Sequence, residues 1–242
     1  MKKILFIFLL AIGVLSANQM QPSNQMQNAK VTNKKPLFMP KNFRAVPLSK
    51  AIILQSGKAK MFCPKCGMTL PMFYKTNHAA TVDGKVMQFC SMHCLIEAMQ
   101  NAKEVKDIKV VDNSTLKFID AKKAFYVVGS SKPATMSKVS KYAFATKEAA
   151  LDFAKKFGGK VLDFNQTLNL AKKEFNADSK MVKMRQAKMA KMGEKVYKQK
   201  CKEVNQKFNS VAEAKAYLMQ NKICNGVKGK ALQAVGIYLK NR

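Results

Sequence analysis

The chain has 242 residues and a formal net charge of +30, from 44 lysines and arginines against 14 aspartates and glutamates. This length is enough for one or two domains with a hydrophobic core. A charge this positive is typical of proteins that bind nucleic acid or an anionic membrane. Only two histidines are present, and no paired carboxylates or phosphate-binding loop stands out, so we expect no enzyme.

The N-terminus has the pattern of a secretory signal peptide. A basic start precedes an apolar run over residues 4–15, and Leu15-Ser16-Ala17 fits a small-residue cleavage site. The run is too short to span a bilayer. We therefore expect residues 1–17 to be removed and the protein to reach the periplasm, where chromosomal DNA is absent. The charge then predicts a lysine-rich surface with no nucleic-acid partner and a weak contact with anionic membrane headgroups at most.

Residues 18–58 are expected to form a flexible N-terminal arm. The stretch 18–28 is rich in Gln, Asn and Met, and Pro36, Pro40 and Pro47 follow it. No cysteine lies at the expected cleavage site, so we expect no lipid anchor.

Residues 59–165 are expected to form an α+β domain. Asp83-Gly84 between two short apolar stretches predicts a β-hairpin, and Ser91 fits the N-cap of a helix. The segment 142–146 repeats this strand and N-cap pattern, and a second helical stretch follows it. The sequence therefore predicts an α+β fold of two similar small strand-helix-strand halves, of which the first alone keeps the cysteines.

Residues 166–242 are expected to be a mainly α-helical C-terminal segment. Two of its stretches, 193–201 and 232–239, resemble the first and last helices of a c-type cytochrome. The haem motif Cys-x-x-Cys-His is absent after Cys201, so no haem is expected. Cys201 and Cys224 are the natural pair for one disulfide. Methionines recur here at helical spacing, at Met181, Met184, Met189 and Met192, which favours a packing surface over a metal site.

The four remaining cysteines form two close pairs. Cys63-Pro-Lys-Cys66 predicts a tight turn, in which Gly67 supplies left-handed backbone, while Cys90 and Cys94 are expected at a strand end and in the following first helical turn. Thiolates at these spacings can converge on one metal ion. The helix N-terminus should also lower the pKa of a thiol there.

The spacing does not fix which metal binds. A closed site of four cysteines most often holds structural Zn²⁺. Thioether sulfur beside thiolate favours Cu(I), and the surrounding methionines are Met61, Met68, Met72, Met87, Met92 and Met99. Together with export, they make Cu(I) in a partly exposed site the leading expectation, with Zn²⁺ as the alternative.

Both histidines are candidates of lower rank. His93 lies beside Cys94 and could ligate the ion or orient a thiolate, although an exposed histidine is the commoner outcome in a short helix. His78 precedes the hairpin, where a surface position is expected.

Two other interpretations of the cysteines fit the sequence less well. Six cysteines in an oxidising compartment could form three disulfides, but such close pairs would constrain the unfolded chain little. A thiol oxidoreductase using Cys63 and Cys66 would need a thioredoxin-like βαβ pattern before them, which is missing.

Several segments together resemble the NosL family, the copper-binding accessory proteins of nitrous-oxide reductase maturation. They are Phe-Cys-Pro-Lys-Cys-Gly-Met at 62–68, Gly-Lys-Val-Met-Gln-Phe-Cys-Ser at 84–91, Ala-Thr-Met at 134–136, Tyr-Ala-Phe-Ala-Thr at 142–146 and Gly-Gly-Lys-Val at 158–161. The resemblance implies two similar α+β halves that bind one Cu(I) and pass it to a periplasmic copper enzyme.

By position, the resemblance makes Cys66, Met68, Cys90 and Met136 candidate ligands. The family often pairs the last methionine with a nearby histidine, whereas serine and lysine follow Met136 here. Family members are commonly lipoproteins without this C-terminal segment. The client would be nitrous-oxide reductase, with a copper oxidase as an open alternative.

The sequence therefore predicts a periplasmic Cu(I) metallochaperone that delivers copper to an exported copper enzyme. The alternative is an exported binding module with a structural Zn²⁺ site that acts through protein contacts of its basic C-terminal helices. The full set of candidate metal ligands is Cys63, Cys66, Met68, Cys90, Cys94, His93 and Met136.

Overall fold

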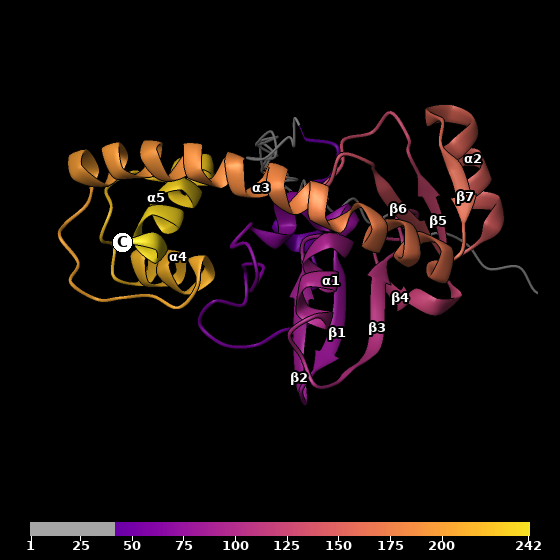
Figure 1. Cartoon of the computed structure of the whole chain (residues 1–242), viewed down its shortest axis with the longest axis horizontal. Helices are drawn as coiled ribbons and strands as arrows, with labels where there is room; N and C mark the ends of the chain where they lie inside the picture. The colour runs from indigo at the N-terminus through magenta and orange to yellow at the C-terminus, as the bar shows by residue number, and fades with distance from the viewer. Residues whose placement is uncertain (1–41) are drawn as a thin grey trace, which may run out of the picture. The chain divides into compact units, whose positions relative to one another are not determined.

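The computed structural model describes residues 42–242 (Figure 1). The expected signal peptide and residues 18–41 of the expected arm lie outside the described residues. The rest of that arm packs on the domain, since Ala45 and Val46 are buried. The N–H of Leu54 also donates to Oε1 of Gln88 over 2.9 Å.

The first half of the domain is an antiparallel four-stranded sheet with one helix. The order of its strands is β2-β1-β3-β4. Asp83 and Gly84 both have positive φ, 45° and 78°, and close the expected hairpin between β1 and β2. The elements are η1 (Leu48–Lys50), η2 (Leu70–Thr76), β1 (His78–Val82), β2 (Lys85–Phe89), α1 (Met92–Met99), β3 (Val105–Val111) and β4 (Phe118–Asp120).

The second half is an antiparallel three-stranded sheet with one helix, and its strand order is β6-β5-β7. Its elements are η3 (Ala121–Lys123), β5 (Phe125–Val128), β6 (Lys141–Phe144), α2 (Lys147–Phe157) and β7 (Lys160–Leu162).

The two halves share one topology, which confirms the predicted α+β fold of two similar halves. In each half the second strand of a hairpin leads into a helix, and the strand after that helix pairs with the first strand. Ser91 and Thr146 are the N-caps, and their hydroxyl oxygens accept from the N–H groups of Cys94 and Ala149. The second half thus has an alanine where the first has a cysteine.

Three helices form the C-terminal segment, as expected: α3 (Phe164–Lys200), α4 (Val211–Gln220) and α5 (Gly229–Asn241). The capping box of Asp163 and Gln166 begins α3, which packs on α1 and β5 and, further along, on α5 (Figure 1). The first residues of α3 belong to the core of the domain, whose side chains there are Phe164, Leu168 and Ala171.

The end of α3, α4 and α5 form a unit with its own core, which we call the C-terminal helical unit. Its buried side chains are Tyr197, Val204, Phe208, Ala214, Leu218, Val227, Leu232, Val235 and Leu239. Cys201 and Cys224 form the expected disulfide. The backbones of α3 and α5 touch at Gly193, because a Cβ there would overlap the carbonyl oxygen of Ala234.

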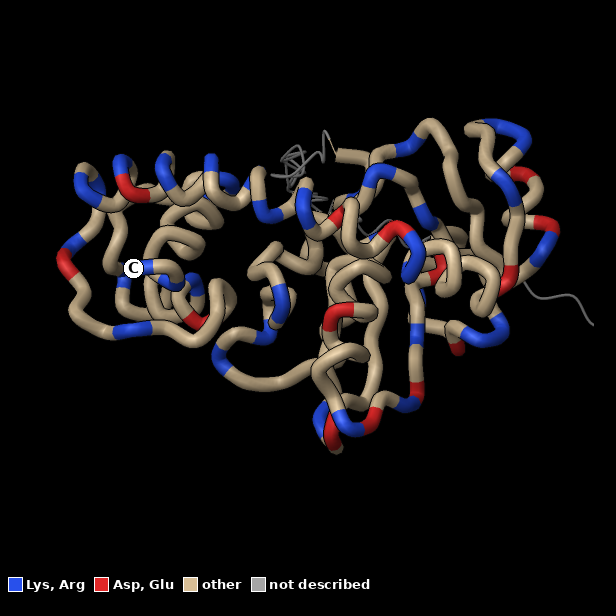
Figure 2. The backbone as a smooth tube through the Cα atoms, in the orientation of Figure 1, with Lys and Arg blue, Asp and Glu red and all other residues tan. Residues whose placement is uncertain are grey.

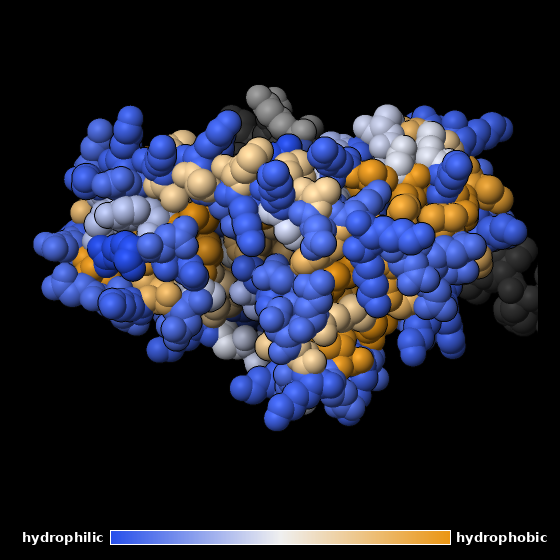
Figure 3. Space-filling model, viewed as in Figure 1, coloured by the Kyte–Doolittle hydropathy of each residue, from blue (hydrophilic) through white to orange (hydrophobic). Residues whose placement is uncertain are grey.

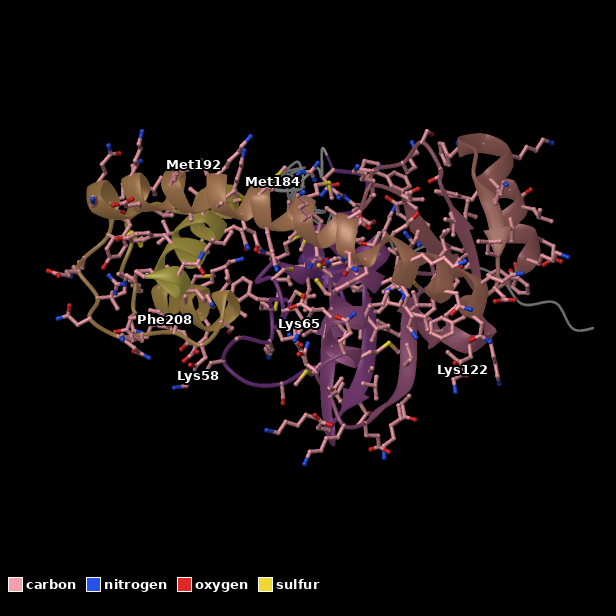
Figure 4. The ribbon with its side chains drawn as sticks, in the orientation of Figure 1. Lys58, Lys65, Lys122, Met184, Met192 and Phe208 are labelled. Carbon is pink, nitrogen blue, oxygen red and sulfur yellow. A yellow bond between two sulfur atoms is a disulfide. The ribbon has the colours of Figure 1, made fainter. Side chains whose placement is uncertain are left out.

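The methionine stripe of α3 is only partly a packing surface. Met181, Met189 and Met192 are half-buried, whereas Met184 is 58% exposed. Figure 4 shows Met184 and Met192 along α3.

Lysine and arginine residues are spread over the elements in view and outnumber the acidic residues (Figure 2). Hydrophilic residues cover most of this face, with smaller apolar patches between them (Figure 3). Within residues 42–242, no helix combines the length and the apolarity that a membrane span requires.

Candidate metal centre

Four cysteines from two separate segments meet inside the first half of the domain. The Sγ atoms of Cys63, Cys66, Cys90 and Cys94 all lie within 4.8 Å of one another. The distance is 3.4 Å between the sulfurs of Cys66 and Cys90 and 3.7 Å between those of Cys90 and Cys94. All four are free thiols. Each is at most 3% exposed, so the site is buried rather than partly exposed as expected.

The first pair lies on a tight turn, residues 63–68, which we call the knuckle. The N–H of Gly67 donates to the carbonyl of Cys63, and the N–H of Cys63 donates to the carbonyl of Met68, each over 2.8 Å. Gly67 has φ of 73°, the left-handed conformation that the sequence predicted for it. Lys65, at the tip of the knuckle, is 3.9 Å from the carboxylate of Glu97 (Figure 4).

The second pair lies at a strand–helix corner. Cys90 directly follows β2, and its carbonyl accepts a hydrogen bond from Oγ1 of Thr76 over 2.8 Å. Ser91 caps α1, and Cys94 is the third residue of that helix. The corner therefore presents both thiols to the knuckle.

These sulfur positions fit one metal ion. A tetrahedral ion with metal–sulfur bonds of about 2.3 Å has sulfur–sulfur edges of about 3.8 Å. The distances in the cluster span this value. Four thiolates are a donor set for a thiophilic ion such as Zn²⁺ or Cu(I). They leave the complex with a net charge of roughly −2 with Zn²⁺ and −3 with Cu(I).

Burial and hydrogen bonding among the four cysteines shift the pKa values of the thiols in opposite directions. Burial raises the pKa of Cys63, but hydrogen bonds from Cys66, Cys90 and Cys94 outweigh burial and hold that pKa well below its ordinary value. Burial raises the pKa of Cys90, and hydrogen bonding to its neighbours raises the pKa of Cys94. The expected lowering of a thiol pKa at this corner is not found, since the pKa values of Cys90 and Cys94 are raised.

Two partly or fully buried cations lie close enough to interact with the thiols. Burial lowers the pKa of Lys215 on α4 to about 7, against the opposing effect of Cys66 and Cys63. Burial also lowers the pKa of Arg44, and Tyr142 and Cys90 partly offset that effect.

His93 does not join the sulfurs. Among the described residues, the group of potential metal ligands at this site consists of the four cysteines. Its ring stacks on Phe175 of α3 at 4.7 Å between centroids. Burial lowers its pKa. The residue is only 7% exposed, so the expectation of an exposed histidine is wrong because α3 covers α1 here.

The expected surface position of His78 is wrong too, since it is 1% exposed. It begins the central strand β1, and its Nε2 lies 3.3 Å from the hydroxyl of Tyr126 in the second half. Its Nδ1 lies 3.2 Å from the carbonyl of Thr76. Burial lowers its pKa to about 4.

The methionine candidates share the core of the four thiols. Met68 and Met136 are half-buried and pack against the buried cluster that contains the cysteines. Met136 has a φ of 57°, left-handed for a non-glycine residue. The other methionines in this core are Met87, Met92 and Met99.

Sequence reasoning missed the residues of the C-terminal helical unit that touch the knuckle. Lys215 donates to the carbonyl of Gly67, and Gln233 donates to that of Cys66. One signal was present, because Lys215 is the single lysine of α4 and lies between two alanines.

The fold and the site define a small α+β metal-binding domain with a buried four-cysteine centre. Residues 55–169 match the model of the NosL family, which confirms the resemblance for this domain. A similar solved structure is the crystal structure of the copper chaperone NosL from Shewanella denitrificans. It is 27% identical, with a TM-score of 0.38, over 47% of this chain and 91% of that one. No curated protein matches the chain.

Proposed function

We propose that this protein is a Cu(I) metallochaperone, which holds one ion between the four cysteines and delivers it to an exported copper enzyme. The observation that carries the proposal is the convergence of four free, buried thiols within a NosL domain. The methionines of the same core support a soft ion. The role is binding and delivery rather than catalysis.

Burial of the sulfurs determines how delivery would proceed. Each thiol is at most 3% exposed, so a client ligand reaches the ion only after a local opening. We expect the opening at the tip of the knuckle, because Pro64 and Lys65 there are half-buried, whereas Cys90 and Cys94 lie at a strand–helix corner. A client sulfur or imidazole would then replace one knuckle thiolate at a time.

The compartment and the client belong to the same proposal. The signal-peptide pattern of residues 1–17 supports a periplasmic location. The match to the NosL family supports nitrous-oxide reductase as the client, with a copper oxidase as the alternative.

A second function is favoured by the same burial. Closed tetrahedral centres of four cysteines commonly hold structural Zn²⁺. In that case the metal would stabilise the domain, and the protein would act through contacts of its basic helices.

Competition for Cu(I) separates the two functions. The reduced protein is titrated against a chromophoric Cu(I) chelator, with Zn²⁺ in parallel. The chaperone proposal predicts one tightly held Cu(I) per chain that excess Zn²⁺ does not displace. Cys66→Ser and Met68→Leu should weaken it, whereas Met184→Leu, at an exposed position of α3, serves as the control. Zn²⁺ that Cu(I) cannot displace without unfolding the domain would support the structural function instead.

A further inference from the structure

Residues of the C-terminal helical unit form hydrogen bonds with the backbone of the knuckle. Nζ of Lys215 on α4 donates to the carbonyl of Gly67 over 2.6 Å. Nε2 of Gln233 on α5 donates to the carbonyl of Cys66 over 2.8 Å. A Cβ at Gly67 would overlap Val211 at the start of α4. Two successive carbonyls of the knuckle are therefore fixed by helices more than a hundred residues away in the chain.

The ammonium of Lys215 is fully hydrogen-bonded in this position. Besides Gly67, it donates to Oε1 of Gln233 over 2.8 Å and to Oγ1 of Thr69 over 3.3 Å. Three acceptors match the three donors of a lysine ammonium. Nζ also lies 4.1 Å from the ring centroid of Phe62. The hydrogen-bond geometry thus fits the charged form of the side chain.

A buried lysine normally needs an anionic partner. Lys215 is 1% exposed, and the ion pairs found among residues 42–242 do not include it. The acidic groups that act on it are the thiols of Cys66 and Cys63. A metal ion bound by four thiolates would form a complex with net negative charge, and this charge would be the anionic partner of the Lys215 ammonium.

We propose that Lys215 and Gln233 are positioning residues of the metal centre, through which the C-terminal helical unit fixes the knuckle. The ammonium of Lys215 also balances the negative charge of the metal–thiolate complex. This inference rests on metal binding by the four cysteines, as the proposed function does, but not on the identity of the metal. It gives α4 and α5 a role, although both lie beyond the segment that matches the NosL family.

The test is the affinity of the full chain for Cd²⁺, with the thiolate-to-Cd²⁺ absorption as the readout. We expect Lys215→Met to weaken Cd²⁺ binding about tenfold or more, the usual effect of losing an outer-shell partner. Gln233→Leu should weaken it as well. Lys230→Met removes an exposed lysine of α5 and is the matched control. Equal affinities of Lys215→Met, Gln233→Leu and the control would overturn the inference.

Binding of a monovalent ion shows whether Lys215 acts on metal affinity through its charge or only through the structure of the knuckle. The complex with Ag⁺ is more negative than that with Cd²⁺, so Lys215→Met should cost more affinity for Ag⁺. Gln233→Leu should cost the same for both ions. Equal losses for both ions in Lys215→Met would overturn the charge role. If Lys215→Met loses helical circular dichroism, the Gln233→Leu variant provides the test instead. Unchanged Cd²⁺ affinity of Gln233→Leu would then refute the positioning role.

The outcomes also separate this inference from the proposed function. Tight Cd²⁺ binding that depends on Lys215, without stable Cu(I) binding, would sustain the inference and reject the chaperone. A wild-type protein that binds neither ion would reject both.

Discussion

The sulfurs of Cys66 and Cys90 lie 3.4 Å apart, although 24 residues separate them in the chain. This contact joins the knuckle to the strand–helix corner and so closes the metal centre. A disulfide needs a sulfur–sulfur distance of about 2.05 Å, so only a short movement separates the two thiols from a bond. The two thiols are therefore close enough to form a disulfide when no metal holds them apart.

We accordingly predict that metal protects these thiols from oxidation. Oxidised glutathione should convert two of the cluster thiols of the metal-free protein into a disulfide and be reduced to two thiols, because the sulfurs are in contact. Alkylation followed by mass spectrometry measures the remaining thiols. The metal-loaded protein should keep all four, and the disulfide of Cys201 and Cys224 is the internal reference. Equal oxidation with and without metal would speak against a shared site.

His78 should make the domain less stable in acid. Burial lowers its folded-state pKa from 6.5 to about 4, so between these values the unfolded state binds more protons than the folded state. Stability is therefore complete above the unfolded pKa and falls as pH drops toward the folded one, by about 3 kcal/mol in total.

The measurement is urea unfolding of the metal-free, reduced protein from about pH 7.5 to about pH 4.5. His78→Gln should lose less stability over this range than the wild type, because the variant has nothing to protonate at this position. Parallel pH profiles of the two proteins would show that His78 is not the titrating group.

Gly67 should resist substitution for two separable reasons. Gly67→Ala places a Cβ against Val211 and also strains a left-handed backbone, which alone costs about 1–2 kcal/mol. Val211→Ala in the same chain removes the nearest atom, Cγ1, but keeps the Cβ of residue 211, so it should recover only a part of the steric cost. The stabilities of the wild type, the two single variants and the double variant, measured by thermal unfolding, form a double-mutant cycle. If the stability losses of the two single variants simply add in the double variant, α4 does not contact the knuckle at this position.

The crossing of α3 and α5 should be intolerant of any side chain at Gly193. Gly193→Ala would overlap backbone atoms of Ala234, which cannot rotate away, so the two helices must separate. We expect a loss of about 1–3 kcal/mol in the stability of the C-terminal helical unit, as for other overpacked sites. Ala187→Gly, at an exposed position of the same helix, should cost about 1 kcal/mol, from helix propensity alone. A Gly193→Ala variant as stable as the wild type would contradict the close crossing.

Local patterns in the sequence sufficed for the elements and the cysteines. Asp83-Gly84 and Ser91 are signals that act within a few residues, and they place the hairpin and helix that carry Cys90 and Cys94. The repeat was readable because both halves keep the same strand and N-cap pattern. The disulfide of the C-terminal helical unit followed from the two cysteines left over.

Burial and long-range contacts were not readable in the same way. His78 sits at a strand end, but Tyr126 of the second half covers it. His93 is covered by Phe175 from α3. Lys215 reaches the knuckle across 148 residues of sequence, so no local pattern announces the contact. Such partners depend on how the halves and helices pack, which periodicity alone does not determine.

X-ray absorption of the protein loaded with one Cu(I) per chain shows directly which atoms hold the ion. We predict a copper first shell made of sulfur alone, at about 2.3 Å, in an edge typical of Cu(I). The shell should lose a sulfur in Cys90→Ser and stay unchanged in Met184→Leu. Nitrogen or oxygen scatterers in the first shell of the wild type, or copper present as Cu(II), would contradict a Cu(I) site built from the four thiolates.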